Sequence, residues 1–159
     1  GGLDERFFAH MEEIDYCWRA QLAGHRVRVV PSSRVWHLGG GTLPRTSATK
    51  LRLNYRNGLL LLDNNLAPTI GRFKARVRII TRLVLDDCSA LVYLLVGKTD
   101  FCGSVFRAHR EYRRLRKVPH KAASRNGDVR GVAPVCIILQ SLLRGERIFD
   151  YLRRYEDSH

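Results

Sequence analysis

Residues 7–19 read Phe7-Phe8-Ala9-His10-Met11-Glu12-Glu13-Ile14-Asp15-Tyr16-Cys17-Trp18-Arg19. Three carboxylates therefore fall within four residues, directly after an aromatic and apolar run. Carboxylates packed this closely repel one another and titrate as a coupled set. Such a cluster serves proton abstraction, a metal ion or a buried arginine. The simpler alternative is an acidic first turn of a helix, where negative side chains suit the positive end of the helix dipole.

The residues after this cluster favour a helix from Glu12 to Ala23. Apolar side chains recur there at helical spacing, at Ile14, Cys17, Trp18 and Leu22. Gly24 follows at a position suited to a helix stop. The sequence thus places all three carboxylates on the first turn of a helix.

Helical spacing then separates the roles of the three acids. Arg19 follows Asp15 by four residues, so the two side chains share a face and can pair. We expect Asp15, the third acid of the candidate catalytic set, to orient the helix. Glu13 is then the candidate general base, with Glu12 as the second choice.

Residues 25–41 predict two short strands and a glycine turn. Residues 25–30 alternate, are rich in valine and end at Pro31, and residues 35–38 form a second short apolar run. His37 lies at the end of that run, where the simplest role is a hydrogen-bonded histidine. Gly39, Gly40 and Gly41 follow, and they can either let the backbone approach phosphate oxygens or form a flexible linker.

A longer helix is predicted from Ser47 to Leu66. Ser47 or Thr49 can cap its start, and Leu51, Tyr55, Leu59 and Leu62 form an apolar stripe. Its polar face includes Arg56, which can contact the chemical site or lie on a solvated surface. We expect the paired asparagines 64 and 65 and Pro68 to end the helix.

Several of these segments, in this order and spacing, resemble the second half of the catalytic domain of a family 2 glycosyltransferase. The similarity is carried by Gly1-Gly2-Leu3-Asp4-Glu5-Arg6-Phe7-Phe8, Glu12-Glu13-Ile14-Asp15-Tyr16-Cys17-Trp18-Arg19, Ala23-Gly24-His25-Arg26-Val27, Val30-Pro31 and Val35-Trp36-His37-Leu38-Gly39-Gly40-Gly41. It covers residues 1–65 well and the remainder loosely. One departure is Glu13, because many relatives have aspartate at this position.

The resemblance implies an α/β fold of the GT-A type, with a Rossmann-like half, followed by a mainly helical extension. It implies an inverting transfer from a nucleotide-sugar donor to a saccharide or lipid-linked acceptor, with Glu13 as general base. His37, Gly39, Gly40 and Gly41 would lie near the donor diphosphate, and His37 would help to hold a divalent cation, Mn²⁺ or Mg²⁺. The run Tyr55-Arg56-Asn57 resembles an Arg-Asn pair of relatives, so Arg56 could reach the diphosphate.

The resemblance also predicts that the chain is a fragment. Residue 1 looks like a cut point, and the nucleotide-binding half with its Asp-x-Asp motif would lie upstream. We therefore expect no turnover by this chain alone. The domain interpretation places the acceptor side of the catalytic domain at 1–66, a basic helical region at 67–118, a linker at 119–131, and an apolar segment with an amphipathic tail at 132–159.

The charge is strongly uneven along the chain. The net charge is +13, and residues 69–125 hold fourteen bases against four acids. An excess of this size implies an anionic partner such as nucleic acid, anionic lipid or a phosphorylated substrate. Four scattered cysteines without metal-ligand spacing are typical of reduced thiols in a cytoplasmic protein.

The basic region carries an apolar stripe at helical spacing, made by Phe73, Val77, Ile80, Val84, Leu91 and Leu95. The consecutive apolar residues of this region are too few, and too often interrupted by charged residues, to span a bilayer. Two interpretations stay open, namely packing in the core and docking on an anionic membrane surface, such as the inner face of the cytoplasmic membrane. A second helix is expected at about 101–117.

Two non-catalytic functions compete with the enzyme interpretation. A basic helical module could bind nucleic acid, but the chain contains no helix-turn-helix, zinc-finger, RNP or KH pattern, so we expect no nucleic-acid partner. A membrane-docking module would explain the basic region and would leave the acid cluster unused. The sequence therefore favours the glycosyltransferase.

Overall fold

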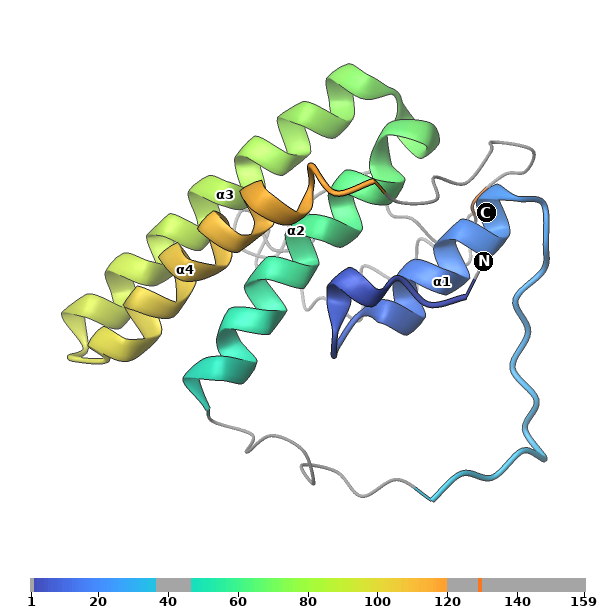
Figure 1. Ribbon diagram of the computed structural model, residues 1–159, viewed down its shortest axis with the longest axis horizontal. Helices are drawn as coiled ribbons and strands as arrows, with labels where there is room; N and C mark the ends of the chain where they lie inside the picture. Colours follow the sequence, from blue (N-terminus) through green and yellow to red (C-terminus); the bar gives the residue numbers. More distant parts are fainter. Residues whose placement is uncertain (1, 37–46, 120–128, 130–159) are drawn as a thin grey trace, which may run out of the picture. The chain divides into compact units, whose positions relative to one another are not determined.

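The computed structural model describes residues 2–36, 47–119 and 129. The chain divides into two compact units, Gly1–Asp128 and Val129–His159, and all the elements named here belong to the first. In chain order they are the short 3-10 helix η1 (Glu5–Phe7), α1 (Glu12–Leu22), α2 (Ala48–Ile70), α3 (Arg72–Leu95) and α4 (Thr99–Leu115), as drawn in Figure 1.

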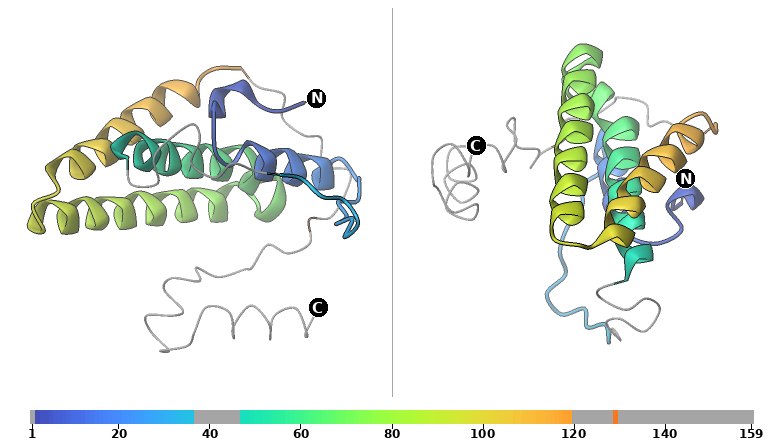
Figure 2. Two further views of the ribbon diagram at one scale, coloured as in Figure 1. Left: turned by 90° about the horizontal axis from the view of Figure 1, so that it is seen from below. Right: turned by 90° about the vertical axis from the view of Figure 1, so that its left-hand side faces the viewer.

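Helix α2 lies at the centre of this unit, because η1, α1, α3 and α4 all pack against it. Helices α3 and α4 run side by side in opposite directions, which the views of Figure 2 show from two sides. The core joins η1, α2 and α4 through four buried side chains, those of Phe7, Leu59, Leu60 and Tyr112. Helix α2 therefore contacts each of the other four helices.

The starts of the first two long helices agree with the sequence predictions. Helix α1 begins at Glu12, and the Ser47 hydroxyl caps α2 by accepting a hydrogen bond from the Lys50 N–H at 3.1 Å. The predicted end of α2 is wrong, because the helix continues through Asn64, Asn65 and Pro68 to Ile70. Both asparagine side chains are buried and donate to Asp15 of α1, and Asn65 also donates to the Leu61 carbonyl oxygen one turn earlier, so both amides are used with the helix intact.

The expected α/β architecture is wrong for the part of the chain that the structure describes. Its residues are helical or irregular, and none of them forms a strand. The predicted strand at 25–30 is irregular and exposed, and so are Val35 and Trp36, the described residues of the second one. Alternation is a property of side chains alone, whereas a strand also needs a neighbouring strand to pair its backbone.

Helix α2 also continues across residues 66–69, where we placed a domain boundary, and the chain turns into α3 at Gly71. Gly71 has a φ of 89°, a left-handed value that favours glycine. Within the described ranges, no helix is long and apolar enough to cross a membrane.

Helix α3 turns its predicted apolar stripe outward. All six stripe residues are exposed, and Phe73 retains 80% of its accessible surface. The helix packs instead through a different face, in which Ala75 and Ala90 are buried and Ile79 and Leu83 contact the core. The interpretation of the stripe as a core-packing face is therefore wrong for these residues.

Candidate functional site

The segment between η1 and α1 has an unusual backbone. Phe8, His10 and Met11 have φ values of 62°, 71° and 71°, in the left-handed region that residues other than glycine rarely adopt. Each such residue costs about 1–3 kcal/mol, and such strain clusters at functional sites. The acid cluster begins directly after this segment, at Glu12.

Asn57 of α2 holds the strained segment in place. Its side-chain Nδ2 lies within hydrogen-bond distance of three carbonyl oxygens, those of Phe7, Ala9 and His10, at 3.0, 2.6 and 2.8 Å. The side chain is fully buried. A buried amide that donates to the Ala9 and His10 carbonyl oxygens satisfies backbone groups that no secondary structure pairs here.

Arg56 supports the same segment from the next position of α2. Its Nη2 donates to the carbonyl oxygens of Phe7 at 2.7 Å and Arg6 at 3.3 Å, and its Nε donates to Asn57 Oδ1 at 2.9 Å. Only 8% of the residue is exposed. Burial lowers the pKa of Arg56, and the Glu111 carboxylate partly offsets this by raising it. The alternative of a solvated face is therefore wrong for Arg56, and its contact with a diphosphate stays a prediction.

Asp15 joins α1 to α2 through a buried polar network. The side chain is fully buried, and Oδ2 accepts from Arg19 Nε at 2.6 Å, which confirms the predicted pair. Oδ1 accepts from the Nδ2 atoms of Asn64 at 3.0 Å and Asn65 at 2.8 Å. Since both oxygens are occupied, Asp15 fixes the position of α1, as we expected from the sequence.

The other two acids of the first turn are placed differently. Glu13 is exposed, and Glu12 is half-buried. Two polar atoms at this point, Glu12 Oε2 and His10 Nε2, are buried without a hydrogen-bond partner among the described residues. A buried polar atom without a partner is rare in a native protein, and it is a reason to look for a ligand.

The predicted glycine turn and its histidine belong to the part of the chain that the structure does not describe. His37, Gly39, Gly40 and Gly41 lie outside the described residues, so their placement near the diphosphate stays a prediction. In the residues that are described, no group of three His, Cys, Asp or Glu side chains is arranged to hold a metal ion. The acid cluster itself is thus not a complete cation site.

Sequence reasoning missed the buried roles of Asn57, Asn64 and Asn65. The signal was present, because positions 57, 64 and 65 are seven and eight residues apart and so fall on one face of a helix. We interpreted Asn64 and Asn65 as a helix end. Repeated amides on one face of a helix are a sign of buried hydrogen bonding to a neighbouring segment.

Comparisons with known proteins add no identification. No family model matches the chain, and neither the curated proteins nor the solved structures give a significant match.

Proposed function

We infer that the chain contributes the acceptor side of an inverting glycosyltransferase, which moves a sugar from a nucleoside-diphosphate donor to a hydroxyl of a saccharide or lipid-linked acceptor. Glu13 is the general base, and Glu12 lies beside it. The sequence resemblance suggests this reaction, and the arrangement around α1 supports it.

The observation that carries the proposal is the difference in burial among the acids of the first turn. Asp15 is fully buried and bound by three donors, whereas Glu13 on the same helical turn is exposed. A helix held this firmly fixes the backbone that carries the exposed carboxylate, and catalysis needs a base within hydrogen-bond reach of the acceptor hydroxyl. The strained residues before α1 are the second support, because backbone strain of this kind costs stability and clusters at functional sites.

In the proposed reaction, the Glu13 carboxylate accepts the proton of the acceptor hydroxyl as its oxygen attacks the anomeric carbon. The bond from that carbon to the diphosphate oxygen breaks on the opposite face, and the configuration at the anomeric carbon is inverted. Negative charge then builds on the departing diphosphate, and positioned N–H groups or cations stabilise it. The exposed carboxylate of Glu13 takes part only in the proton transfer from the acceptor hydroxyl.

The divalent cation that the resemblance implies does not fit the described residues by themselves. They contain no group of three side chains suited to a metal, and His37 lies beyond them. We therefore assign no step to a cation on these residues. Addition and removal of Mn²⁺ or Mg²⁺ is a separate variable in the experiment.

The decisive experiment measures release of nucleoside diphosphate by the natural protein from a panel of sugar nucleotides, with and without Mn²⁺ or Mg²⁺. Glu13→Gln should lower kcat by about 10²- to 10⁴-fold, the contribution expected of a general base. Donor affinity and Tm should stay unchanged, because Glu13 is exposed.

Glu5→Gln is the matched control, because Glu5 is an exposed acid of η1 outside the cluster. It should keep full activity. Glu12→Gln distinguishes the two neighbouring candidates, since the base is the residue whose amide removes turnover while donor binding persists. Absence of donor-dependent release of nucleoside diphosphate, or full activity of both Glu13→Gln and Glu12→Gln, would contradict the proposal.

A second candidate is a membrane-docking role without catalysis. The observation that favours it is the exposed apolar stripe of α3. Vesicle binding by a natural protein that releases no nucleoside diphosphate from any donor would support this role in place of the enzyme.

A further inference from the structure

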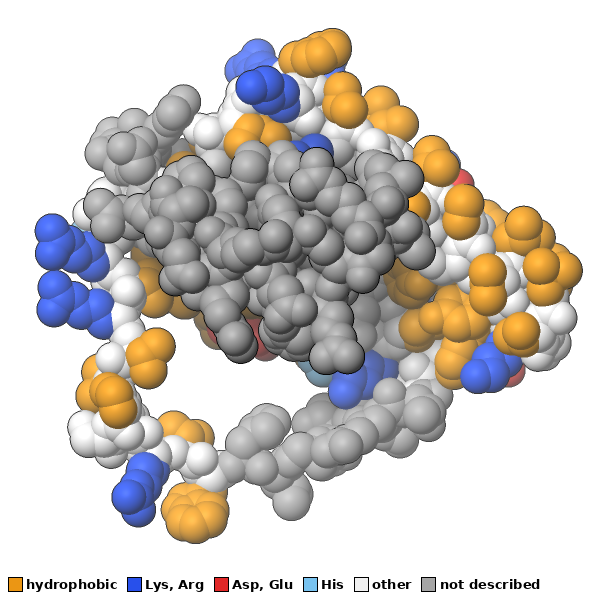
Figure 3. Space-filling view, turned by 180° about the vertical axis from the view of Figure 1, so that it is seen from behind, with side chains coloured by type: hydrophobic (Ala, Val, Ile, Leu, Met, Phe, Trp, Pro, Cys, Tyr) orange, Lys and Arg blue, Asp and Glu red, His pale blue; other side chains and the backbone are white. Residues whose placement is uncertain are grey.

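The outer face of α3 is apolar over most of its length. The stripe formed by Phe73, Val77, Ile80, Val84, Leu91 and Leu95 has spacings of three, four and seven residues, so its members share one side of the helix. Phe73 and Leu95 are 80% and 77% exposed. Figure 3 shows hydrophobic side chains gathered along this part of the surface. Patches of this kind mark interaction sites.

Basic residues line both edges of the stripe at its first turns. The order is Arg72-Phe73-Lys74 and then Arg76-Val77-Arg78, so a base stands on each side of an apolar residue twice in succession. Neighbouring residues lie about 100° apart around a helix, which places the bases at the two edges. Residues 72–85 contain five bases and no acid.

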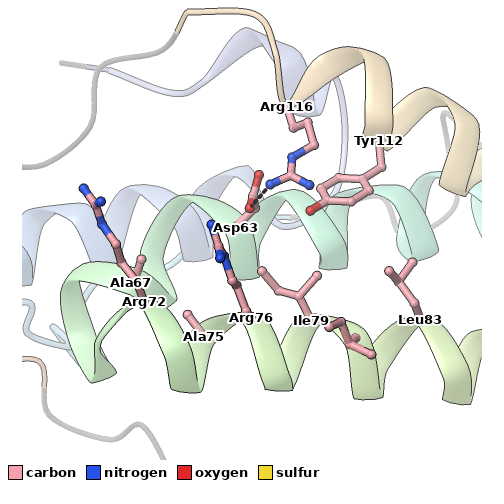
Figure 4. A pocket seen from close by; sticks show the side chains of 10 residues that line it. Asp63, Ala67, Arg72, Ala75, Arg76, Ile79, Leu83, Tyr112 and Arg116 are labelled. Carbon is pink, nitrogen blue, oxygen red and sulfur yellow. Dashed lines mark hydrogen bonds and ion pairs between the residues drawn. The ribbon is translucent and has the colours of Figure 1, made fainter.

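A cavity of about 540 Å³ opens beside this end of the stripe, between α2, α3 and α4. Arg72 and Arg76 of α3 and Arg116, just after α4, contribute cationic groups, and Ile79 and Leu83 contribute an apolar wall (Figure 4). Ile80 belongs both to the cavity lining and to the exposed stripe. The cavity and the stripe are therefore continuous.

Part of the cavity is already paired, and part is available for an anion. Arg116 Nη2 lies 3.1 Å from Asp63 Oδ1, and its guanidinium lies over the ring of Tyr112. Arg72 and Arg76 have no ion-pair partner among the described residues. Burial and the nearby Asp63 carboxylate raise the pKa of Tyr112 to about 12, so its hydroxyl stays protonated. The groups open to an anion are those of Arg72 and Arg76.

We propose that α3 docks on the surface of an anionic phospholipid bilayer. Its apolar stripe enters the boundary between headgroups and acyl chains, and the cavity beside it receives a lipid phosphate. A helix lying in the membrane interface has this combination of an apolar face and a basic polar face. The bases at both edges reach the headgroups while their aliphatic stems cover apolar surface.

The charges distinguish a bilayer from other occupants of the stripe. A second copy of this chain carries the same net charge of +13 and would be repelled by it. Nucleic acid would use the bases and would leave the six apolar side chains in water. An anionic bilayer satisfies both features of the face. This proposal does not depend on glycosyl transfer.

The test uses the full chain and vesicles of phosphatidylcholine, either alone or mixed with phosphatidylglycerol, and scores binding by co-sedimentation. The chain should bind the mixed vesicles and not the neutral ones, and binding should weaken as salt screens the charges. Equal binding to both vesicles, or to neither, would overturn the proposal.

Two substitutions test the stripe itself. Val77→Asp and Val84→Asp should each lower vesicle affinity at least tenfold, because each places a carboxylate in the interface. Phe106→Asp is the control, since Phe106 is an exposed apolar residue of α4, and it should bind like the unchanged chain. The same three variants are compared by Tm and by sedimentation velocity at several concentrations.

Tm and sedimentation velocity show whether something other than a bilayer covers the stripe. Unchanged Tm in Val77→Asp and Val84→Asp supports an open face, whereas a large fall would show that another segment of the chain covers the stripe. Self-association that disappears in these variants would show that a second copy covers it. Either of the last two results would overturn the proposal.

The cavity is tested by the double variant Arg72→Gln, Arg76→Gln, with Arg113→Gln as a control base on α4. Each base near an anionic surface contributes about fivefold to affinity, so the double variant should lose about 25-fold and Arg113→Gln no more than about fivefold. Inorganic phosphate that raises the Tm of the unchanged chain and not of the double variant, with no vesicle binding by either, would assign the cavity to soluble phosphate and overturn the membrane proposal.

Discussion

The contact between α1 and α2 and the outer face of α3 distribute polarity in opposite ways. At the first, Asp15, Asn57 and Asn65 are fully buried, although they are polar or charged. At the second, apolar residues such as Phe73 and Val84 are exposed. Both arrangements depart from the usual preference of each residue type.

The difference lies in whether partners are present. The carboxylate of Asp15 has three donors, and the amide of Asn57 reaches three carbonyl oxygens, so most of the polar atoms at this contact have partners within the chain. The stripe on α3 has no such cover among the described residues. We therefore expect substitutions in the first region to change stability, and substitutions in the second to change binding.

The largest expected effect on stability is that of Asp15→Ala. The change removes the acceptor of Arg19, Asn64 and Asn65 and leaves buried donors unpaired. Removal of one partner of a buried pair costs about 3–5 kcal/mol, measured as the free energy of unfolding in urea. Glu13→Ala, at an exposed position of the same turn, should stay within about 0.5 kcal/mol. A loss at Asp15 no larger than that at Glu13 would contradict the role of the network.

Asn57→Ala should have the next largest effect. It removes the side-chain donor of the Ala9 and His10 carbonyl oxygens, whereas that of Phe7 keeps its bond from Arg56, and unsatisfied buried groups cost about 1–3 kcal/mol. Asn54→Ala, at a half-buried position of the same helix, is the matched control and should change stability by no more than about 0.5 kcal/mol. Both are read by urea unfolding, and amide hydrogen exchange of residues 8–11 should rise only in the first.

Asp4, which caps η1 and lies 3.3 Å from Asn64 of α2, provides a smaller, pH-dependent test beside this contact. Burial acts to raise its pKa, but hydrogen bonds from Arg6 outweigh burial and lower the pKa below the ordinary 3.8. The unfolded chain therefore binds the proton at a higher pH than the folded chain. The stabilisation is fully present above the unfolded pKa and is lost as pH falls through the folded pKa.

Asp4→Asn should accordingly destabilise the chain at neutral pH and flatten the fall of stability in acid. The measurement is the urea midpoint as a function of pH, from neutral to strongly acidic solution. Identical slopes for the variant and the unchanged chain in the acid range would show that Asp4 does not contribute to this dependence.

The smallest expected effect is that of Leu95→Ala on the stripe. Leu95 is 77% exposed, so the substitution should change the free energy of unfolding by less than about 0.5 kcal/mol. Leu60→Ala makes the same chemical change in the core and should cost about 2–5 kcal/mol. Similar losses at the two leucines would show that the stripe is covered and would remove the contrast between the regions.

The sequence was sufficient where the deciding contacts are local. The start of α1 at Glu12, the pair between Asp15 and Arg19, and the Ser47 cap of α2 each involve residues at most four positions apart. Helical geometry converts such spacing directly into contact. The periodicity of α3 likewise located its apolar face.

Sequence reasoning was wrong or incomplete where the partner lies far along the chain. Asn64 and Asn65 contact Asp15 across 49 and 50 residues, and nothing in their own neighbourhood indicates that contact. The alternation at 25–30 suggested a strand, yet it carried no information on whether a second strand would lie beside it. The candidate site was recognised through its acids, while the amides that hold it were missed.

Spacing along the chain thus determined where the first helices begin, which side of α3 is apolar and where the positive charge gathers, because each depends on neighbours within one or two helical turns. Only the tertiary structure decided that Asp15 is buried, that Glu13 is exposed and that the stripe of α3 faces outward. These outcomes depend on which distant segments meet, and burial is a property of that meeting rather than of any single residue.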